Sequence, residues 1–332
     1  MDSYFKDAPC VKWKDWAWSL LPFQQSKEPY PLSFSKPSTF VPETLRPRLI
    51  STTIEVAREL SEFLGLYFYS NTSPYSLVLS PRLILHLLET KQMAGLEIRD
   101  QKGLLIACIF EFFMGMYMEK RVGLISWLCV HPQWRKKGIT NTLCHAISYD
   151  TTWGAEIKWF RNDALFRSSL PPIYSTKIID RDIRQRTHSY IEKRNFESCK
   201  EEFIALWKGA NPTGFVFESS KVVPRQCMIW GFEKEDTRLW VLLQPTHEVK
   251  RGKGKHGCEI LHVVSRGFKD MYEQVQIFEM IVDSLPFDYC ECPIGVPHID
   301  ALWIVKGVST WSVVGLHPGY PFQRPVLSLV VS

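Results

Sequence analysis

The segment best suited to bind a ligand is a short basic turn that contains glycine. An apolar stretch ends at Val130 before the turn, and the apolar spacing of a helix begins at Ile139 after it. A strand that runs through such a turn into a helix offers backbone N–H groups and the positive end of the helix dipole to an anion. The pattern therefore favours a pyrophosphate site, although a solvated basic turn capping a helix would have the same sequence. The site residues would be Arg135, Lys136, Lys137, Gly138, Ile139 and Thr140.

Three other signals are weaker. Cys290 and Cys292 with His298 lack the paired spacing of a zinc site, so we expect no metal. Without a Gly-x-Ser-x-Gly motif, a serine nucleophile is not indicated. The run Lys250–His256 carries four positive charges and is more typical of a solvated hairpin loop than of an RNA or anionic-surface patch.

Length and composition favour a chain of about two globular domains. The chain has 332 residues, 45% of them hydrophobic, and a formal net charge of +5, which is too mild to predict a nucleic-acid partner. The longest nearly apolar run, Gly103–Met118, has 16 residues and contains Glu111, whereas a transmembrane helix needs about 20. We expect no membrane span. The first residues lack a secretion signal and the nine cysteines are scattered, so we expect a cytoplasmic protein with free, mostly buried thiols.

The elements that would position the basic turn follow from periodicity. Residues 1–47 are rich in proline and serine, and we expect an irregular N-terminal arm. Helical spacing predicts helices over Ser51–Leu66, Pro81–Glu89 and Ile139–Tyr149. Runs of β-branched and aromatic residues predict an antiparallel meander of strands, over Ala94–Ile98, Gly103–Phe113 and Gly123–Val130.

A charged stretch, Asp180–Lys200, is interpreted as the passage into a second half, so we place the boundary near residue 180. The order of helix, hairpin strands, helix and strand then repeats, which predicts two similar α/β halves over 48–179 and 180–332. The expected helices of the second half are Cys199–Lys208 and Lys269–Ser284, and the expected strands are Gln226–Phe232, Leu239–Leu243, Cys258–Val264 and others near the end.

The basic turn resembles the pyrophosphate loop of the GNAT superfamily of acyl-CoA N-acyltransferases. The strand before it, Ser126–His131, is similar to the Asn-Phe-Leu-Cys-Val-His strand of the glycylpeptide N-myristoyltransferase family, with four consecutive residues in agreement from Leu128 onward. Glu28–Phe34 is similar to another segment of that family. The resemblance covers nearly the whole chain and suggests a diverged family member. It implies an α/β fold of two GNAT-like halves that form a mixed, largely antiparallel central sheet flanked by helices.

The resemblance also implies roles for particular residues. A bulge in strand 126–130 would expose the backbone N–H groups of Trp127 and Leu128 as an oxyanion hole. The turn would grip the phosphates of CoA, and the α-carboxylate of Ser332 would be the base that takes a proton from the acceptor amine. An ordinary terminal strand ending in water is the alternative at Ser332. No covalent acyl-enzyme is implied, so Cys129 is expected to be a buried core thiol.

Two departures from the family concern the acceptor. Where the family has an acidic segment, this chain has Tyr69–Ser73, and where it has Gly-Asp-Gly, this chain has Gly307–Ser309. Because carboxylates help to accept a basic peptide, recognition of a basic acceptor is in doubt.

The function implied is transfer of a fatty acyl group, myristoyl in the family, from acyl-CoA to the N-terminal glycine amine of a protein. The half 48–179 would bind acyl-CoA and the half 180–332 the N-terminal segment of the acceptor. Acyl-CoA would be a co-substrate, with no permanently bound cofactor. The alternatives are a GNAT acetyltransferase that uses a short acyl-CoA, and a non-catalytic relative that binds acyl-CoA or peptide.

Overall fold

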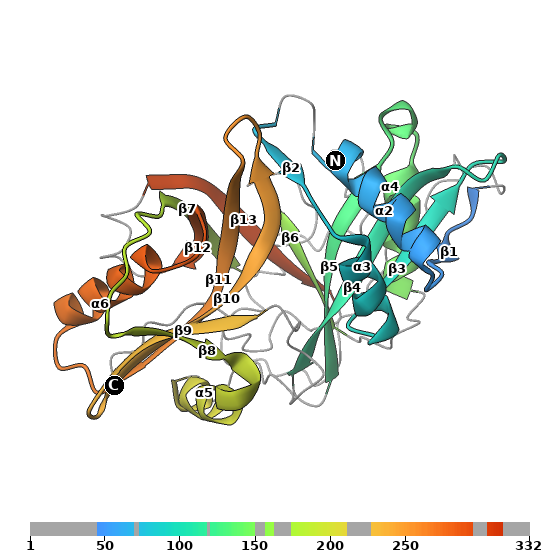
Figure 1. The fold of residues 1–332 in the computed structure, drawn as a ribbon. Coiled ribbons are helices and arrows are strands. Elements are labelled where there is room, and N and C mark those ends of the chain that lie inside the picture. The colour runs from blue at the N-terminus through green and yellow to red at the C-terminus, as the bar shows by residue number, and fades with distance from the viewer. Residues whose placement is uncertain are drawn as a thin grey trace, which may run out of the picture. The chain divides into compact units, whose positions relative to one another are not determined.

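The computed structural model describes residues 45–69, 73–117, 120–149, 157–162, 174–210, 227–294 and 304–314 (Figure 1). The contacts divide the chain into two compact units. The first contains Met1–Ser175 and Thr310–Phe322, and the second contains Thr176–Ser309 and Gln323–Ser332. The short stretch that begins at Thr310, which the sequence places in the second half, thus belongs by its contacts to the first unit. Most of the expected arm, residues 1–47, lies outside the described residues.

The first unit is built on a sheet with the strand order β1-β3-β4-β5-β6 followed by part of β13. Its elements are β1 (Arg48–Leu49), α2 (Ile54–Tyr67), β2 (Tyr75–Leu77), α3 (Pro81–Glu89), β3 (Met93–Arg99), β4 (Leu105–Tyr117), β5 (Lys120–Val130), the 3₁₀ turn η2 (Pro132–Trp134), α4 (Ile139–Tyr149), β6 (Ile157–Asn162) and β13 (Ile304–Val314). Strands β3, β4 and β5 form the predicted antiparallel meander, and β6 runs parallel to β5.

Helices cover both faces of this sheet, as Figure 1 shows for α2 and α3 against α4. One face packs on α2 and α3, and the core between the sheet and these helices includes the buried side chains of Leu60, Leu64, Ile84, Cys108 and Phe110. The opposite face packs on α4, and the core on that side includes the buried side chains of Ile109, Ile125, Ile139, Leu143 and Ile147. Because side chains alternate along a strand, consecutive residues of β4 serve the two cores.

The helix starts follow local capping. The Thr53 side chain accepts a hydrogen bond from the N–H of Val56, so α2 begins at Ile54, later than the predicted Ser51. Helix α3 has Pro81 in its first turn, where a missing N–H costs nothing, and its predicted bounds are confirmed. The predicted bounds of α4 are also confirmed.

The second unit has a sheet with the order β7-β12-β11-β10-β9-β8. Its elements are β7 (Tyr174–Asp182), β8 (Ile191–Asn195), α5 (Phe196–Ala210), β9 (Met228–Lys234), β10 (Thr237–Lys250), β11 (Lys255–Arg266), α6 (Met271–Asp283) and β12 (Tyr289–Ile294). Strand β12 runs parallel to β11, as β6 does to β5, and α6 connects the pair as α4 does in the first unit. The predicted mixed, largely antiparallel α/β fold is confirmed.

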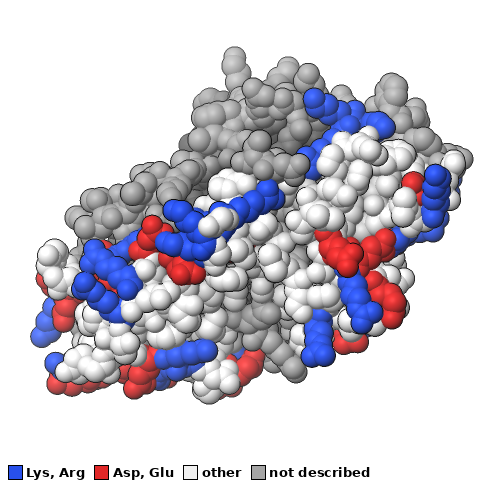
Figure 2. Space-filling model, turned by 45° about the horizontal axis from the view of Figure 1, so that its top comes forward, with Lys and Arg blue, Asp and Glu red and all other residues white. Residues whose placement is uncertain are grey.

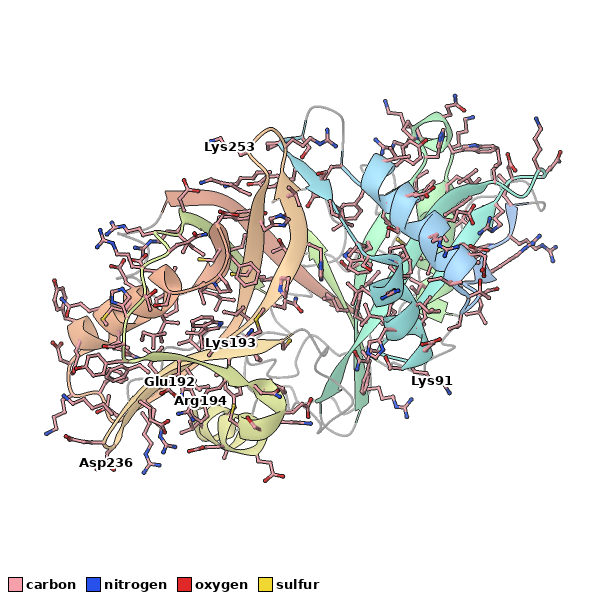
Figure 3. All side chains as sticks on the ribbon, in the orientation of Figure 1. Lys91, Glu192, Lys193, Arg194, Asp236 and Lys253 are labelled. Carbon is pink, nitrogen blue, oxygen red and sulfur yellow. The ribbon has the colours of Figure 1, made fainter. Side chains whose placement is uncertain are left out.

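The sequence did not predict β6, β7 or β8. The stretch Asp180–Lys200, interpreted only as a charged passage, contains the end of β7, all of β8 and the start of α5. Strand β8 is the last strand of its sheet and pairs with β9, so its charged side chains Glu192 and Lys193 remain exposed (Figure 3). Such a strand lacks the alternating apolar pattern by which strands are predicted.

Surface charge is mixed rather than gathered in one field. On the face drawn in Figure 2, Lys and Arg side chains lie interspersed with Asp and Glu over the described residues. Lys253 lies at the tip of the β10–β11 hairpin (Figure 3), where residues 251–254 are exposed. Two neighbouring cations have partners in the unit: Lys250 lies 4.3 Å from the centre of the Tyr289 ring, and Lys255 lies 3.2 Å from Asp182. These contacts fit a solvated hairpin turn.

A bilayer-spanning helix is not found in the part of the chain that the structure describes. The same described residues contain no cluster of His, Cys, Asp and Glu arranged to hold a metal ion, and His298 lies outside them. The cysteines whose side chains are described are buried: Cys108, Cys129, Cys144, Cys199, Cys227, Cys258 and Cys290.

Candidate functional site

Strand β5 carries the expected bulge next to its end. Cys129 pairs with Cys108 of β4 and Ser126 pairs with Phe110, so two residues of β5, Trp127 and Leu128, face a single residue of β4. An extra residue in one strand is left out of the regular ladder of hydrogen bonds. The bulge therefore gives the backbone at Trp127 and Leu128 a geometry different from the rest of the strand.

The backbone of Trp127 is strained. Its φ is +48°, a left-handed conformation that a bulky L-residue rarely adopts and that costs on the order of 1–3 kcal/mol. Packing holds the residue there: the Trp127 ring lies edge-on to Phe112 at 4.7 Å and to Phe110 at 5.7 Å between centroids. Trp127 packs against the core under α2 and α3, whereas Leu128 packs against the core under α4. The two side chains of the bulge thus anchor the backbone between them from both faces.

On its other edge, β5 pairs with β6 over only part of its length. The parallel pairing with β6 joins Val122–Ile125 to Ile157–Phe160. Within the described residues β5 continues from Ser126 to Val130 beyond the last pair of this register. The bulge therefore lies beyond the residues of β5 that pair with β6.

The turn after β5 is held in place by its own side chains. The His131 ring accepts a hydrogen bond from the N–H of Gln133 at the start of η2, and it lies edge-on to Tyr67 of α2 at 4.6 Å. Arg135 donates from Nε to the carbonyl of Val130 at 3.0 Å and from its terminal nitrogen to the carbonyl of Tyr67 at 2.8 Å. The guanidinium of Arg135 thus fastens the end of β5 to the end of α2. The partner role of Tyr67 gave no signal in the sequence, because a backbone carbonyl is common to every residue.

The backbone between Arg135 and α4 has two left-handed residues next to a helix start, features that are typical of anion sites. Lys136 and Gly138 have φ values of +64° and +78°, and left-handed residues within a turn orient successive N–H groups toward one side. The carbonyl of Gly138 accepts from the N–H and the hydroxyl of Thr142, so Gly138 begins α4. The first N–H groups of the helix lack partners within the helix. The first turn of α4 has no acidic side chain that would compete for its positive end.

The basic side chains of the turn face solvent. Lys136 and Lys137 are exposed, and the Lys137 ammonium lies 4.7 Å from the centre of the Trp134 ring. Ile139 is buried under the helix, and Thr140 is half-buried beside it. The structure therefore brings the expected residues Arg135–Thr140 into one turn with solvent access, directly after the bulge of Trp127 and Leu128.

The cysteines near the bulge are unsuited to nucleophilic chemistry. Burial raises the pKa of the Cys129 thiol to about 12, although the charge of Arg135 partly offsets this. Burial also raises the pKa of Cys108, which faces Cys129 across the strands, well above its ordinary value. Both groups are therefore neutral thiols at physiological pH.

Two expected features fall partly or wholly outside the described residues. Ser332 and the strand expected over Val326–Ser332 lie outside them, and so do Ser70–Thr72 of the segment that replaces the family's acidic stretch. The described neighbours of that segment are aromatic: the Tyr69 ring lies 4.9 Å from Phe68 and 6.2 Å from Tyr75. Gly307–Ser309 lies in β13.

No protein-family model and no curated protein sequence matches this chain. Solved structures do. A crystal structure of Saccharomyces cerevisiae N-myristoyltransferase with bound myristoyl-CoA and inhibitors is similar with a TM-score of 0.62 and 12% identity, over 89% of this chain and 88% of that one. A second structure of the yeast enzyme with bound myristoyl-CoA has a TM-score of 0.61 and 12% identity over 89% and 86% of the two chains. A third has a TM-score of 0.57 and 13% identity over 88% and 89%.

The chain therefore has an α/β fold of the kind seen in the yeast N-myristoyltransferase structures. The fold is similar to that of N-myristoyltransferase over 89% of this chain. The resemblance expected from Ser126–His131 and the basic turn is confirmed at the level of the fold.

Proposed function

We propose that this chain transfers a fatty acyl group from acyl-CoA to the N-terminal amine of a protein. The observation that carries the proposal is the strained bulge at Trp127–Leu128, directly upstream of an anion-binding turn, in a chain with the fold of N-myristoyltransferase. Strained backbone persists only where the surrounding structure holds it, and it is found most often at functional sites. At this bulge, the strained conformation would orient two N–H groups toward the substrate.

In the proposed reaction, Arg135–Thr140 bind the phosphates of CoA. The backbone carries most of this interaction, through the N–H groups at the start of α4 and the left-handed residues Lys136 and Gly138. Lys136 and Lys137 add exposed positive charge. Arg135 acts mainly by holding the turn against the ends of β5 and α2 through its two carbonyl contacts.

The chemical step is direct attack of a neutral amine on the thioester. The amine adds to the thioester carbonyl and forms the new C–N bond. The tetrahedral intermediate then collapses, the C–S bond breaks, and the proton lost by the nitrogen passes to the departing sulfur, so that CoA leaves as a free thiol. Trp127 and Leu128 donate their N–H groups to the oxygen that becomes negative in the tetrahedral intermediate. Before the attack, the α-carboxylate of Ser332 takes the proton that makes the acceptor amine neutral, since an α-amino group with a pKa near 7.7–8 is mostly protonated at neutral pH.

The proposed donor is myristoyl-CoA and the proposed acceptor is an N-terminal glycine, as in glycylpeptide N-tetradecanoyltransferases. Support for the donor comes from the similar yeast structures, which hold myristoyl-CoA. The aromatic neighbours of Tyr69 offer no carboxylate to a basic acceptor, so the proposed acceptor segment is neutral or apolar beyond its glycine.

Calorimetric titration with CoA, acetyl-CoA and myristoyl-CoA tests the donor. Each buried methylene adds about 0.8 kcal/mol, which is roughly a fourfold gain in affinity. We expect binding of all three ligands, with myristoyl-CoA bound far more tightly than acetyl-CoA. Equal affinity for the two acyl-CoAs would favour a short-acyl acetyltransferase instead, and no binding of any of them would contradict the proposal.

A further inference from the structure

The first unit contains a buried ion pair on the side of the sheet that packs on α4. Glu111 of β4 and Lys158 of β6 have side chains that are 5% and 2% exposed, and the Lys158 Nζ lies 3.5 Å from Glu111 Oε2. The two strands are not neighbours, because β5 runs between them. Two long charged side chains therefore meet across the middle strand, which requires space on that strand.

Gly123 of β5 supplies this space. It pairs with Lys158 on one side, and its neighbour on the same face of β5, Ile125, pairs with Glu111 on the other. A Cβ at Gly123 would overlap Glu111 Oε1 and lie 2.8 Å from Glu111 Cγ. The carboxylate thus lies directly over the glycine, and any larger residue at position 123 would displace it.

The Lys158 ammonium also contacts the helix of the proposed phosphate site. It donates a hydrogen bond to the carbonyl of Ile147, in the last turn of α4. The last carbonyls of a helix lack intrahelical donors and form the negative end of the helix dipole, where a cation is stabilising. Helix α4 therefore has a buried cation at one end and, at the other, the turn proposed to bind phosphate.

The pair is not the arrangement that stability alone would favour. Glu111 Oε1 is buried without a hydrogen-bond partner among the described residues, and burial raises the pKa of Glu111 even though the charge of Lys158 lowers it. Buried ion pairs are often no more stabilising than apolar side chains of similar volume. The pair does, however, set the position of one helix end from two different strands.

We propose that Glu111 and Lys158, with Gly123 as the gap between them, are positioning residues that fix α4 so that its N-terminus meets the phosphates of CoA. The inference rests on the proposed function. Lys158 holds the carbonyl end of α4 against β6, and Glu111 orients the Lys158 ammonium. Movement of this end shifts the N-terminal N–H groups relative to the bulge, and such misplacement weakens binding without removing any contact residue.

The test uses the full-length protein with Glu111→Gln and Lys158→Met combined. Removing both charges avoids the lone buried charge that either single substitution could leave, and that could prevent folding. The control is Glu97→Gln with Arg99→Met, because that partly buried ion pair lies on the α2 side of the same sheet, where Arg99 also binds Glu59. Two ligands are titrated: myristoyl-CoA, and S-myristoyl-pantetheine, which lacks the nucleotide and its phosphates.

We expect the double variant to bind myristoyl-CoA about tenfold more weakly and to bind S-myristoyl-pantetheine as the unaltered protein does. The control should change neither affinity. Undiminished binding of myristoyl-CoA by the folded double variant, or an equal loss for both ligands, would overturn the positioning role alone. Failure of the unaltered protein to bind myristoyl-CoA would overturn the proposed function and this inference with it.

Discussion

At Trp127 the side chain and the backbone have separate tasks. The ring packs on Phe110 and Phe112, while the backbone holds a left-handed φ of +48° that a tryptophan would not adopt unaided. In the proposed reaction only the backbone N–H touches the substrate. The identity of residue 127 therefore matters through the conformations it allows rather than through its functional groups.

Two substitutions that both remove the ring separate these tasks. Glycine adopts a positive φ freely, whereas valine is strongly disfavoured there. We expect both Trp127→Gly and Trp127→Val to lower stability, by about 2 kcal/mol or more for the lost aromatic packing. The kcat of the valine variant should be about 100-fold below that of the glycine variant, since one oxyanion donor is worth that much. Equal kcat values at saturating acyl-CoA would contradict the oxyanion role of the bulge.

A second prediction at the residue scale concerns Cys129, which should take no part in the reaction. Burial raises the pKa of the Cys129 thiol to about 12, so the thiol is neutral at pH 7 and is unsuited to accept an acyl group. We expect Cys129→Ala to retain turnover, at a modest cost in stability. The intact mass of the unaltered protein after mixing with acyl-CoA should show no acyl adduct at this residue. A Cys129-dependent adduct that is consumed on adding the acceptor would require a covalent mechanism.

At the scale of elements, β5, the turn and α4 together form the proposed site for acyl-CoA. The bulge interrupts the regular pairing of β4 with β5, Arg135 fastens the turn to α2, and α4 begins after Gly138. The proposed phosphate site depends on the helix start more than on any one charge, because backbone N–H groups supply most of the contacts.

Glutamate at position 138 should therefore abolish acyl-CoA binding without unfolding the protein, since it introduces an anion where the phosphates would bind. A matched control is Gly103→Glu, because Gly103 has a similar φ of +83° in an exposed turn with open space around it. Both variants carry a similar backbone penalty of about 1 kcal/mol. Calorimetry should find binding lost only in the Gly138 variant, and retained binding there would remove the phosphate role of the turn.

The helices and strands around the proposed site were predicted well from the sequence. Helices α3 and α4 have clear 3.6-residue spacing, and the meander of β3, β4 and β5 has long apolar runs. The end of β7 and all of β8 escaped prediction because they lie in the charged stretch Asp180–Lys200, which lacks an alternating apolar pattern. The bulge was expected only through resemblance to a known family. The left-handed φ of Trp127, the carbonyl partners of Arg135 and the pairing of Glu111 with Lys158 arise from contacts between distant segments, which one sequence does not reveal.

At the scale of the whole molecule, the proposed reaction needs groups from far apart in the chain. The oxyanion donors and the phosphate turn lie within residues 127–140, and the proposed base is the carboxylate of Ser332. A terminal carboxylate can serve as a base only if the chain ends there, so the proposal ties activity to the position of the last residue.

Extension of the chain by a few residues beyond Ser332 should therefore abolish most turnover, because it replaces the carboxylate with a neutral amide. Acyl-CoA binding should be unchanged, since the phosphate turn is intact. The same residues added before Met1 provide the control. Full turnover by the C-terminally extended protein would eliminate Ser332 as the base.

The central claim is that this chain transfers an acyl group to an amine, and release of free CoA thiol measures it most directly. The protein would be mixed with myristoyl-CoA, with and without a mixture of peptides that begin with glycine. We predict thiol release that depends on the peptides. If a folded sample that binds myristoyl-CoA releases no more thiol with the peptides than a protein-free blank does, the result would contradict the transferase activity. The protein would then be one that only binds acyl-CoA.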